Sequence, residues 1–344
     1  MLLLAWFGGC ESREKIPLRV FVAGSLFLPF AELEKAYEAA HPNVDILLEA
    51  HGSIQVIRNV TEIHERVDVV VSADHALIPM MMYATGDPDT GKPYAMWHIK
   101  FASNELVLAY TSRSRYADEI NRDNWHEIIA RPDVKVGIAD PRLDPCGYRS
   151  LMTLKLTESV REGSTVFAEV ILGQFKNGIT AEDEGGVSII RIQENLDIKP
   201  DARLIIRNSS IQLIALLESG DIDYAFEYES ATLQRNLLLL RLPDAVNLGV
   251  PEYAAEYAKV QVRMDFQRFL SVNPVFNGEV IGYGVTIPTN APNPKEAEEF
   301  VAFLLGPEGR KIMEANYHPF ISPMEGNGYD AIPKRLQALC VPMQ

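Results

Sequence analysis

Two short loops carry residue types suited to holding an anion. A Gly-Ser step lies between a β-rich run and a helix-like run in both Ala23-Gly24-Ser25-Leu26 and His51-Gly52-Ser53-Ile54. Glycine allows a tight turn, serine supplies a hydroxyl donor, and the free amide groups of the helix that follows point toward a negative group. We therefore predict that Gly24, Ser25 and Ser53 belong to an anion-binding site.

Two further loops have the same position after a β-rich run. They are Asp144-Pro145-Cys146-Gly147 and Asn208-Ser209-Ser210. The second precedes an apolar helix-like run at 211–217, so Ser209 or Ser210 should cap that helix, whose first amides are free for an anion. A lone serine at such a place is most often only a cap. Because four such loops are predicted to face one cleft, we favour a binding role for Ser210.

The elements that must position these loops alternate between strands and helices, which favours an α/β layered architecture. Residues 18–23, 44–48 and 67–73 have the composition of strands, and residues 29–40 carry apolar side chains at helical spacing. Such continuous apolar strands suit a parallel sheet covered on both faces. A second series has strands at 134–139 and 204–207 and helices at 148–160 and 211–218. A strand at 223–228 should lead back toward the first lobe, and the tail continues with a strand at 281–287 and helices at 294–305 and 308–316.

The length of the chain predicts two lobes, because 344 residues exceed the size at which one core usually stops growing. We assign residues 18–99 and 230–344 to the first lobe, residues 100–229 to the second, and residues 1–17 to a segment before both. Two α/β lobes joined by more than one crossing make a hinge and a cleft. Ligands of such sheets gather at the carboxyl ends of strands, which the four loops follow.

The charge of the chain limits its partners. A formal net charge of −15 opposes binding to nucleic acid or to an anionic membrane, so any anion must be captured locally. The seven histidines form no HExxH pair and no G-x-S-x-G elbow is present, which argues against a zinc enzyme and a serine hydrolase. We predict no catalytic residues and no cofactor.

The three cysteines are too few and too scattered for a disulfide framework. Cys10 closes an apolar run and is followed by the polar residues 11–15, as at the end of a lipoprotein signal whose cysteine is lipidated. The run is shorter than a full signal, so residues 1–17 are interpreted as a signal remnant and tether. An N-terminal segment without a signal is the alternative.

The segment Pro141-Arg142-Leu143-Asp144-Pro145-Cys146-Gly147-Tyr148-Arg149 is the most specific in the chain. With AGSL, GS, DPCGYRS and DYAFEYES in this order, the sequence resembles the substrate-binding proteins of ABC transporters for molybdate and tungstate, in particular the archaeal-type members. The resemblance runs from about Leu18 to Met324. It implies a type II periplasmic-binding-protein fold, with two lobes, a hinge and an interlobe cleft.

The resemblance also implies a set of neutral donors to the bound oxyanion. Ser25 and Ser53 would donate hydroxyl and backbone hydrogen bonds. The backbone amides of Cys146 and Ser210 would complete the cradle. Tyr228 matches a tyrosine that donates to the oxyanion in the bacterial relatives.

Two carboxylates that bind the metal centre of the oxyanion are implied as well. Asp144 matches the first, and the second should lie in residues 223–229, where Glu227 is favoured over Glu229. Carboxylates repel a dianion and become tolerable only if its central atom is a hard, high-valent metal that accepts oxygen donors. Such a site would select molybdate or tungstate over sulfate and phosphate. The sequence does not rank tungstate against molybdate.

Several alternatives stay open at this point. Asp144 has the position of a turn residue before Pro145, and Glu227 that of an exposed charge at a strand end. The same fold could serve sulfate, phosphate or ferric iron. As a pair, the two carboxylates could act as general acid and base in a glycosidase, which would need a long aromatic groove. For Arg149 and Arg207 we favour a structural role, since guanidinium groups commonly order carboxylates and carbonyls.

The resemblance implies a place for the protein as well as a ligand. We expect a monomeric extracytoplasmic receptor, anchored through lipidated Cys10 to the outer face of the cytoplasmic membrane. It would deliver one oxyanion to a membrane permease with a cytoplasmic ATPase. Contacts made only in the closed state would drive the closure of the two lobes.

Overall fold

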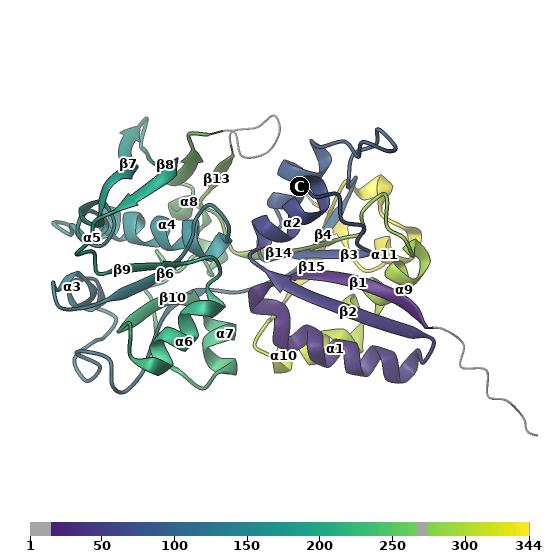
Figure 1. Ribbon diagram of the computed structural model, residues 1–344, viewed down its shortest axis with the longest axis horizontal. Coiled ribbons are helices and arrows are strands. Elements are labelled where there is room, and N and C mark those ends of the chain that lie inside the picture. The colour runs from purple at the N-terminus through teal and green to yellow at the C-terminus, as the bar shows by residue number, and fades with distance from the viewer. Residues whose placement is uncertain (1–14, 267–273, 344) are drawn as a thin grey trace, which may run out of the picture.

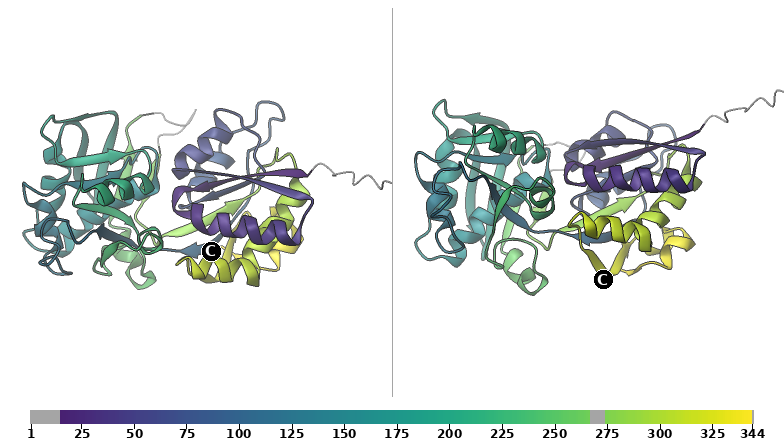
Figure 2. Two further views of the ribbon diagram at one scale, coloured as in Figure 1. Left: turned by 60° about the horizontal axis from the view of Figure 1, so that its bottom comes forward. Right: turned by 90° about the horizontal axis from the view of Figure 1, so that it is seen from below.

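The computed structural model of the chain describes residues 15–266 and 274–343, which form two lobes lying side by side (Figure 1). The predicted two-lobed α/β architecture is confirmed. Cys10 and the predicted signal segment up to residue 14 lie outside the described residues. Figure 2 shows that the segments connecting the lobes lie along one side of the molecule.

The first lobe is built on one sheet with the strand order β16-β15-β4-β14-β3-β1-β2. Its strands are β1 (Ile16–Ala23), β2 (Val44–His51), β3 (Val69–Ser72), β4 (His98–Ser103), β14 (Gly282–Thr286), β15 (Phe320–Asn327) and β16 (Val341–Pro342). Its helical segments are η1 (Gly24–Leu26), α1 (Phe27–Ala40), α2 (Ser53–Thr61), η2 (Ile78–Tyr83), α9 (Pro294–Leu305), α10 (Pro307–Ala315), η5 (Tyr329–Ala331) and α11 (Lys334–Gln337).

The centre of this sheet explains the continuous apolar runs in the sequence. Val20, Phe21 and Val22 of β1 are all fully buried, because β1 has a strand on each side and helices over both faces. Helix α2 lies on one face, and α1 with α10 on the other (Figure 1). The sheet is mixed rather than parallel, since β14 pairs antiparallel with both β3 and β4.

The second lobe contains two sheets, with the strand orders β11-β5-β10-β6-β9 and β13-β12-β8-β7. Its strands are β5 (Leu106–Tyr110), β6 (Val136–Ala139), β7 (Phe175–Glu184), β8 (Val187–Ile198), β9 (Leu204–Arg207), β10 (Tyr224–Tyr228), β11 (Leu238–Arg241), β12 (Val260–Met264) and β13 (Val275–Asn277). Its helical segments are α3 (Trp125–Ala130), α4 (Pro145–Val160), α5 (Val166–Val170), η3 (Leu172–Gln174), α6 (Ile211–Ser219), α7 (Glu229–Gln234), η4 (Pro251–Tyr253) and α8 (Ala254–Tyr257).

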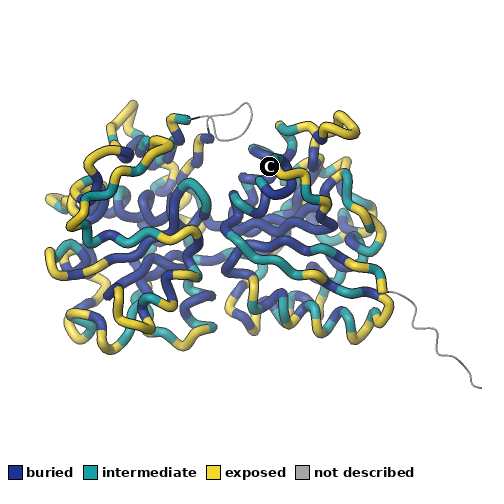
Figure 3. The backbone as a smooth tube through the Cα atoms, viewed as in Figure 1, coloured by how far each residue is buried: buried dark blue, intermediate teal, exposed yellow. Residues whose placement is uncertain are grey.

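Helix α4 is the centre of this lobe. It contacts β6 and β10 of one sheet and β12 and β8 of the other. This position between two sheets buries side chains on all sides of the helix, including the charged Arg149. Figure 3 shows that buried segments fill each lobe and continue to the line where the lobes meet.

The crossings between the lobes differ from the boundaries expected from the sequence. The chain leaves the first sheet between β4 and β5, a few residues after residue 100. We expected its return at residue 230, but β11 pairs with β5 and β12 pairs with β8, so the strands between residues 238 and 277 lie in the second-lobe sheets. The physical reason is α7, which turns the chain back to the edge of the same sheet after β10. The return to the first sheet is at β14.

Candidate functional site

All four loops predicted to bind an anion meet where the lobes face each other. A Cβ atom added to Gly24 would lie 2.9 Å from the hydroxyl oxygen of Ser209. A Cβ atom added to Gly52 would lie only 2.5 Å from the carbonyl oxygen of Leu143. Each Gly-Ser loop of the first lobe therefore approaches one loop of the second, at a distance that leaves no space for a larger residue.

Asp144 is the N-cap of α4, where Pro145 occupies the first turn. One carboxyl oxygen accepts a hydrogen bond from the Cys146 amide at 2.9 Å, and the other accepts one from the Ser210 amide at 3.2 Å. The side chain is thus a turn residue, as one alternative proposed, and it also reaches the loop before α6. Burial raises the pKa of this carboxyl, although the two amides oppose the shift.

Glu227 is only 1% exposed, so its interpretation as an exposed charge is wrong. Its Oε1 accepts hydrogen bonds from the Ser210 hydroxyl and from the Tyr228 amide, both at 2.8 Å. Its Oε2 is buried and has no hydrogen-bond partner among the described residues. Burial, reinforced by the Asp144 charge and opposed by the Tyr228 amide and the Ser210 hydroxyl, raises the pKa of Glu227 to about 8.

Ser210 joins the two carboxylates, because its amide donates to Asp144 and its hydroxyl to Glu227. Glu229 is not part of this group, since its carboxylate pairs with Arg241. In the ranges 15–266 and 274–343, no group of three or more His, Cys, Asp and Glu side chains is arranged to hold a metal ion. Burial disfavours the charged form of both carboxyls, and an electron-accepting ligand would favour it.

The first lobe contributes hydroxyl groups instead of carboxylates. Ser53 begins α2, and its hydroxyl oxygen accepts the Ala73 amide at 2.9 Å, which leaves its own proton for another acceptor. The Ser25 hydroxyl lies 3.0 Å from that of Tyr283. Asn104 also donates to Tyr283 at 3.0 Å, which favours Tyr283 as the donor to Ser25 and leaves the Ser25 proton for a ligand.

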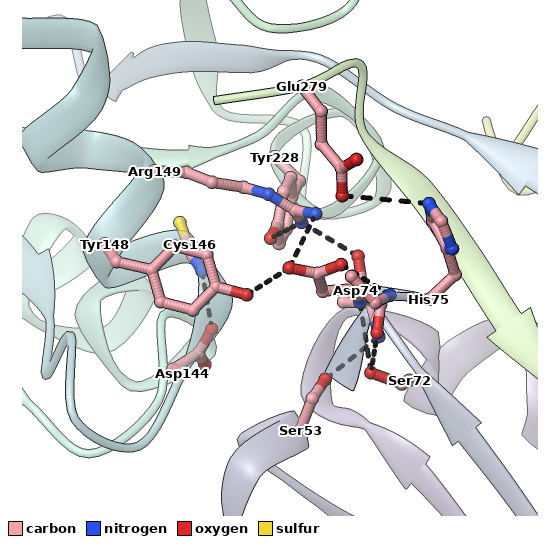
Figure 4. A network of polar contacts seen from close by, with 12 residues as sticks. Ser53, Ser72, Asp74, His75, Asp144, Cys146, Tyr148, Arg149, Tyr228 and Glu279 are labelled. Atoms are coloured by element: carbon pink, nitrogen blue, oxygen red, sulfur yellow. Dashed lines mark hydrogen bonds and ion pairs between the residues drawn. The ribbon is translucent and has the colours of Figure 1, made fainter. Parts of the chain in front are cut away.

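Tyr228 ends β10 beside these groups and is fully buried. Its hydroxyl oxygen accepts a hydrogen bond from Arg149 at 2.8 Å (Figure 4). Arg149 also donates to the Ala73 carbonyl at 2.8 Å and lies 3.5 Å from a carboxyl oxygen of Asp74. Arg149 thus orders a carbonyl and a carboxylate, as the structural role predicted for it requires, whereas Arg207 is exposed and donates to the carbonyl of Ile206.

Sequence reasoning missed three residues of this region: Asp74, Asn104 and Tyr283. Asp74 follows β3 as the other loops follow their strands, so its place after an apolar run was an available signal. Asn104 lies in the crossing between β4 and β5, and Tyr283 lies in β14. Neither had a local signal, because each reaches the site only through the pairing of distant segments.

Two α/β lobes that meet over a group of buried polar residues have the architecture of a solute-binding protein. The chain belongs to the bacterial extracellular solute-binding protein family, whose sequence profile matches residues 18–317. A solute-binding protein of Methanoculleus marisnigri is 39% identical over 327 residues, which cover 95% of this chain and 87% of the relative. One of Petrotoga mobilis is 38% identical over 339 residues, with 98% and 94% coverage.

Solved structures share the fold at low sequence identity. The periplasmic molybdate-binding protein of Azotobacter vinelandii has a TM-score of 0.55 and 14% identity, covering 88% of this chain and 98% of that one. A sulfate-binding protein of Mycobacterium tuberculosis has a TM-score of 0.55 and 12% identity, covering 89% and 88%. Within the described part of the chain, no helix has the length and apolar character needed to cross a membrane.

Proposed function

We propose that this solute-binding protein captures tungstate or molybdate and delivers it to the permease of an ABC transporter with a cytoplasmic ATPase. The observation that carries the proposal is the pair of buried carboxyls, Asp144 and Glu227, held by one serine inside a site otherwise composed of neutral donors. In this proposal the protein binds and releases its ligand and catalyses no reaction.

The carboxyls give the site its selectivity. Sulfur and phosphorus in their tetrahedral oxyanions have no room for further oxygen ligands, whereas molybdenum and tungsten accept them. The unpartnered Oε2 of Glu227 is the atom available for such a bond. Rotation of the Asp144 carboxyl toward the metal centre would break its bonds from the amides of Cys146 and Ser210, which are then free for the oxygens of the ligand.

The remaining donors hold the oxygens of the ligand without selecting its central atom. Ser25 and Ser53 from the first lobe each keep a hydroxyl proton for an acceptor, and the turn at Gly24 brings Ser25 to the second lobe. Tyr228 donates from the second lobe, because its oxygen already accepts from Arg149.

Sulfate is the second candidate ligand, since a sulfate-binding protein shares this fold and the serine and tyrosine donors suit any tetrahedral dianion. The two carboxyls count against it, because each would repel a ligand that offers no bond in return. Ferric iron is less well suited, since burial raises the pKa of Tyr228 well above its ordinary value and opposes the phenolate that iron prefers. A glycosidase would need an open groove, but Asp144 and Glu227 are 5% and 1% exposed.

The place of action follows from the family and from the proposed leader. We infer that the monomeric protein works outside the cytoplasmic membrane, tethered to its outer face by a lipid on Cys10. Labelling of Cys10→Ser and unaltered protein with a radioactive fatty acid tests the tether, since only the unaltered chain should be labelled.

Calorimetric titration with tungstate, molybdate, sulfate and phosphate tests the ligand. The proposal expects binding of tungstate or molybdate at least about 100-fold tighter than of sulfate, as metal coordination adds bonds that sulfate cannot form. Stronger binding of sulfate or phosphate, or no binding of any oxyanion, would refute it.

A further inference from the structure

A buried polar contact between the lobes lies beside the residues proposed to bind the ligand. Asp74 follows β3 in the first lobe and is buried. Tyr148 of α4 donates its hydroxyl proton to one oxygen of this carboxylate, and Arg149 of the same helix lies 3.5 Å from that oxygen (Figure 4). Arg149 also donates to the carbonyl of Ala73. Two successive residues of one helix therefore hold two successive residues of the opposite lobe.

The charges of this connection are matched. Burial alone would raise the pKa of Asp74, but the Arg149 guanidinium, with further contributions from His75 and the Tyr148 hydroxyl, holds it below its ordinary value. The ion pair is thus charged in the contact between the lobes. Separation of the lobes would leave Arg149, which is 2% exposed here, without its carboxylate.

The direction of hydrogen bonding extends this contact to the ligand. A guanidinium can only donate, so the oxygen of Tyr228 is the acceptor in its 2.8 Å contact with Arg149. The proton of Tyr228 must then point to another acceptor. The same Nη1 atom donates to the Ala73 carbonyl at 2.8 Å. The first lobe therefore holds the guanidinium group in the position from which it donates to Tyr228.

We propose that Arg149 is a positioning residue that makes Tyr228 a donor to the ligand only when the Ala73-Asp74 segment of the first lobe docks against it. Closure of the lobes then completes the oxyanion site, and the ligand in turn stabilises closure, because each contact requires the other. The hydrogen bond between Tyr148 and Asp74 joins the two lobes in this arrangement. This inference rests on the proposed function, since it needs an oxyanion that accepts the Tyr228 proton.

A double-mutant cycle tests the inference by calorimetric titration with sodium tungstate. Arg149→Lys keeps the positive charge but loses the planar guanidinium group, and Tyr228→Phe removes the hydroxyl. Each single variant should bind about tenfold more weakly, the effect of one charge-assisted hydrogen bond. The double variant should bind no more weakly than the weaker single variant, because Arg149 acts through Tyr228. Arg207→Lys, at an exposed arginine outside the contact, should bind as the unaltered protein does.

Additive losses, about 100-fold in the double variant, would overturn the inference, because Arg149 would then contact the ligand or support the fold independently of Tyr228. Failure of the unaltered protein to bind any oxyanion would refute the proposed function, and the inference with it. Binding by the unaltered protein with additive losses would refute the inference alone.

A second pair of variants keeps the test informative if Arg149→Lys does not fold. Asp74→Asn removes the charge that holds Arg149, and Tyr148→Phe removes one hydroxyl while the ring keeps its stack on Phe276 at 4.3 Å. In small-angle scattering, tungstate should reduce the radius of gyration of the unaltered protein, to a smaller extent that of Tyr148→Phe, and least or not at all that of Asp74→Asn. Full compaction of Asp74→Asn with unaltered affinity would overturn the inference.

Discussion

The two lobes supply different chemistry to one site. The first lobe offers hydroxyl protons on Ser25 and Ser53, and the second offers the carboxyls of Asp144 and Glu227 on either side of Ser210. Hydroxyl donors suit any tetrahedral anion, whereas buried carboxyls suit only a ligand that can bind to them. Under the proposed function, capture and selection are therefore separable: the first lobe would recognise the charge of the ligand, and the second would recognise its central atom.

The strongest test of this division removes one carboxylate of the second lobe. Glu227→Gln keeps the size of the side chain but loses the metal-binding oxygen, so tungstate should bind about 100-fold more weakly, while sulfate should bind as well or better. Calorimetric titration of both oxyanions measures the change in selectivity. Glu229→Gln, two positions along but paired with Arg241, is the matched control and should bind tungstate normally. Equal weakening of tungstate binding by Glu227→Gln and Glu229→Gln would contradict the proposed division of roles between the lobes.

The same carboxyl should reduce the stability of the protein without ligand. Burial, with the Asp144 charge, raises the pKa of Glu227 from its ordinary 4.5 to about 8. The folded state therefore loses stability as pH rises from about 4.5 toward 8, because only the unfolded chain ionises freely there. Ligand-free Glu227→Gln should be more stable than the unaltered protein by about 4 kcal/mol at pH 8 and nearly equal to it near pH 4.5. Urea unfolding at both pH values measures this, and a difference independent of pH would contradict the assignment.

Ligand binding should carry the opposite pH dependence. Since the pKa of Glu227 is about 8, a ligand that bonds to the carboxylate must displace a proton below that pH. The apparent affinity for tungstate should rise about tenfold per unit between pH 6 and pH 8 and then level off. Titration in buffers of different ionisation enthalpy would reveal the released proton. An affinity unchanged over this range would indicate that Glu227 stays protonated and donates to the ligand.

The smallest effect is expected in the first lobe. Ser53→Ala removes a hydroxyl donor but leaves both carboxyls in place, so binding of tungstate and molybdate should weaken about fivefold and by the same factor for each. Competition titrations compare the two. A change in the ratio between the ligands would show that the first lobe also selects, and would remove the proposed difference between the lobes.

The parts of the fold that local patterns encode were predicted well. β9 (Leu204–Arg207) and α9 (Pro294–Leu305) coincide with the expected residues. A short apolar run marks β9, and an amphipathic spacing that begins at a proline marks α9. The hairpin of β7 and β8 was not predicted. Its turn, Gly185-Gly186, has φ values of 57° and 86° and was the available signal.

The residues of the candidate site that directly follow a strand could be predicted from the sequence. The four loops and the preference for Glu227 over Glu229 came from such positions and from the family resemblance. The Arg149-Asp74 contact was not predictable, because it depends on how two lobes approach each other. The bond from the Ser210 amide to Asp144 was not predictable either, because it depends on how two loops of the second lobe pack against each other.

X-ray absorption at the tungsten edge of the loaded protein tests the central claim most directly, because it reports the oxygen atoms bound to the metal. We expect an octahedral centre in the unaltered protein, with oxygen from Asp144 and Glu227 added to those of tungstate, and fewer bound oxygens in Glu227→Gln. A tetrahedral spectrum, equal to that of free tungstate and unchanged by the substitution, would contradict the account.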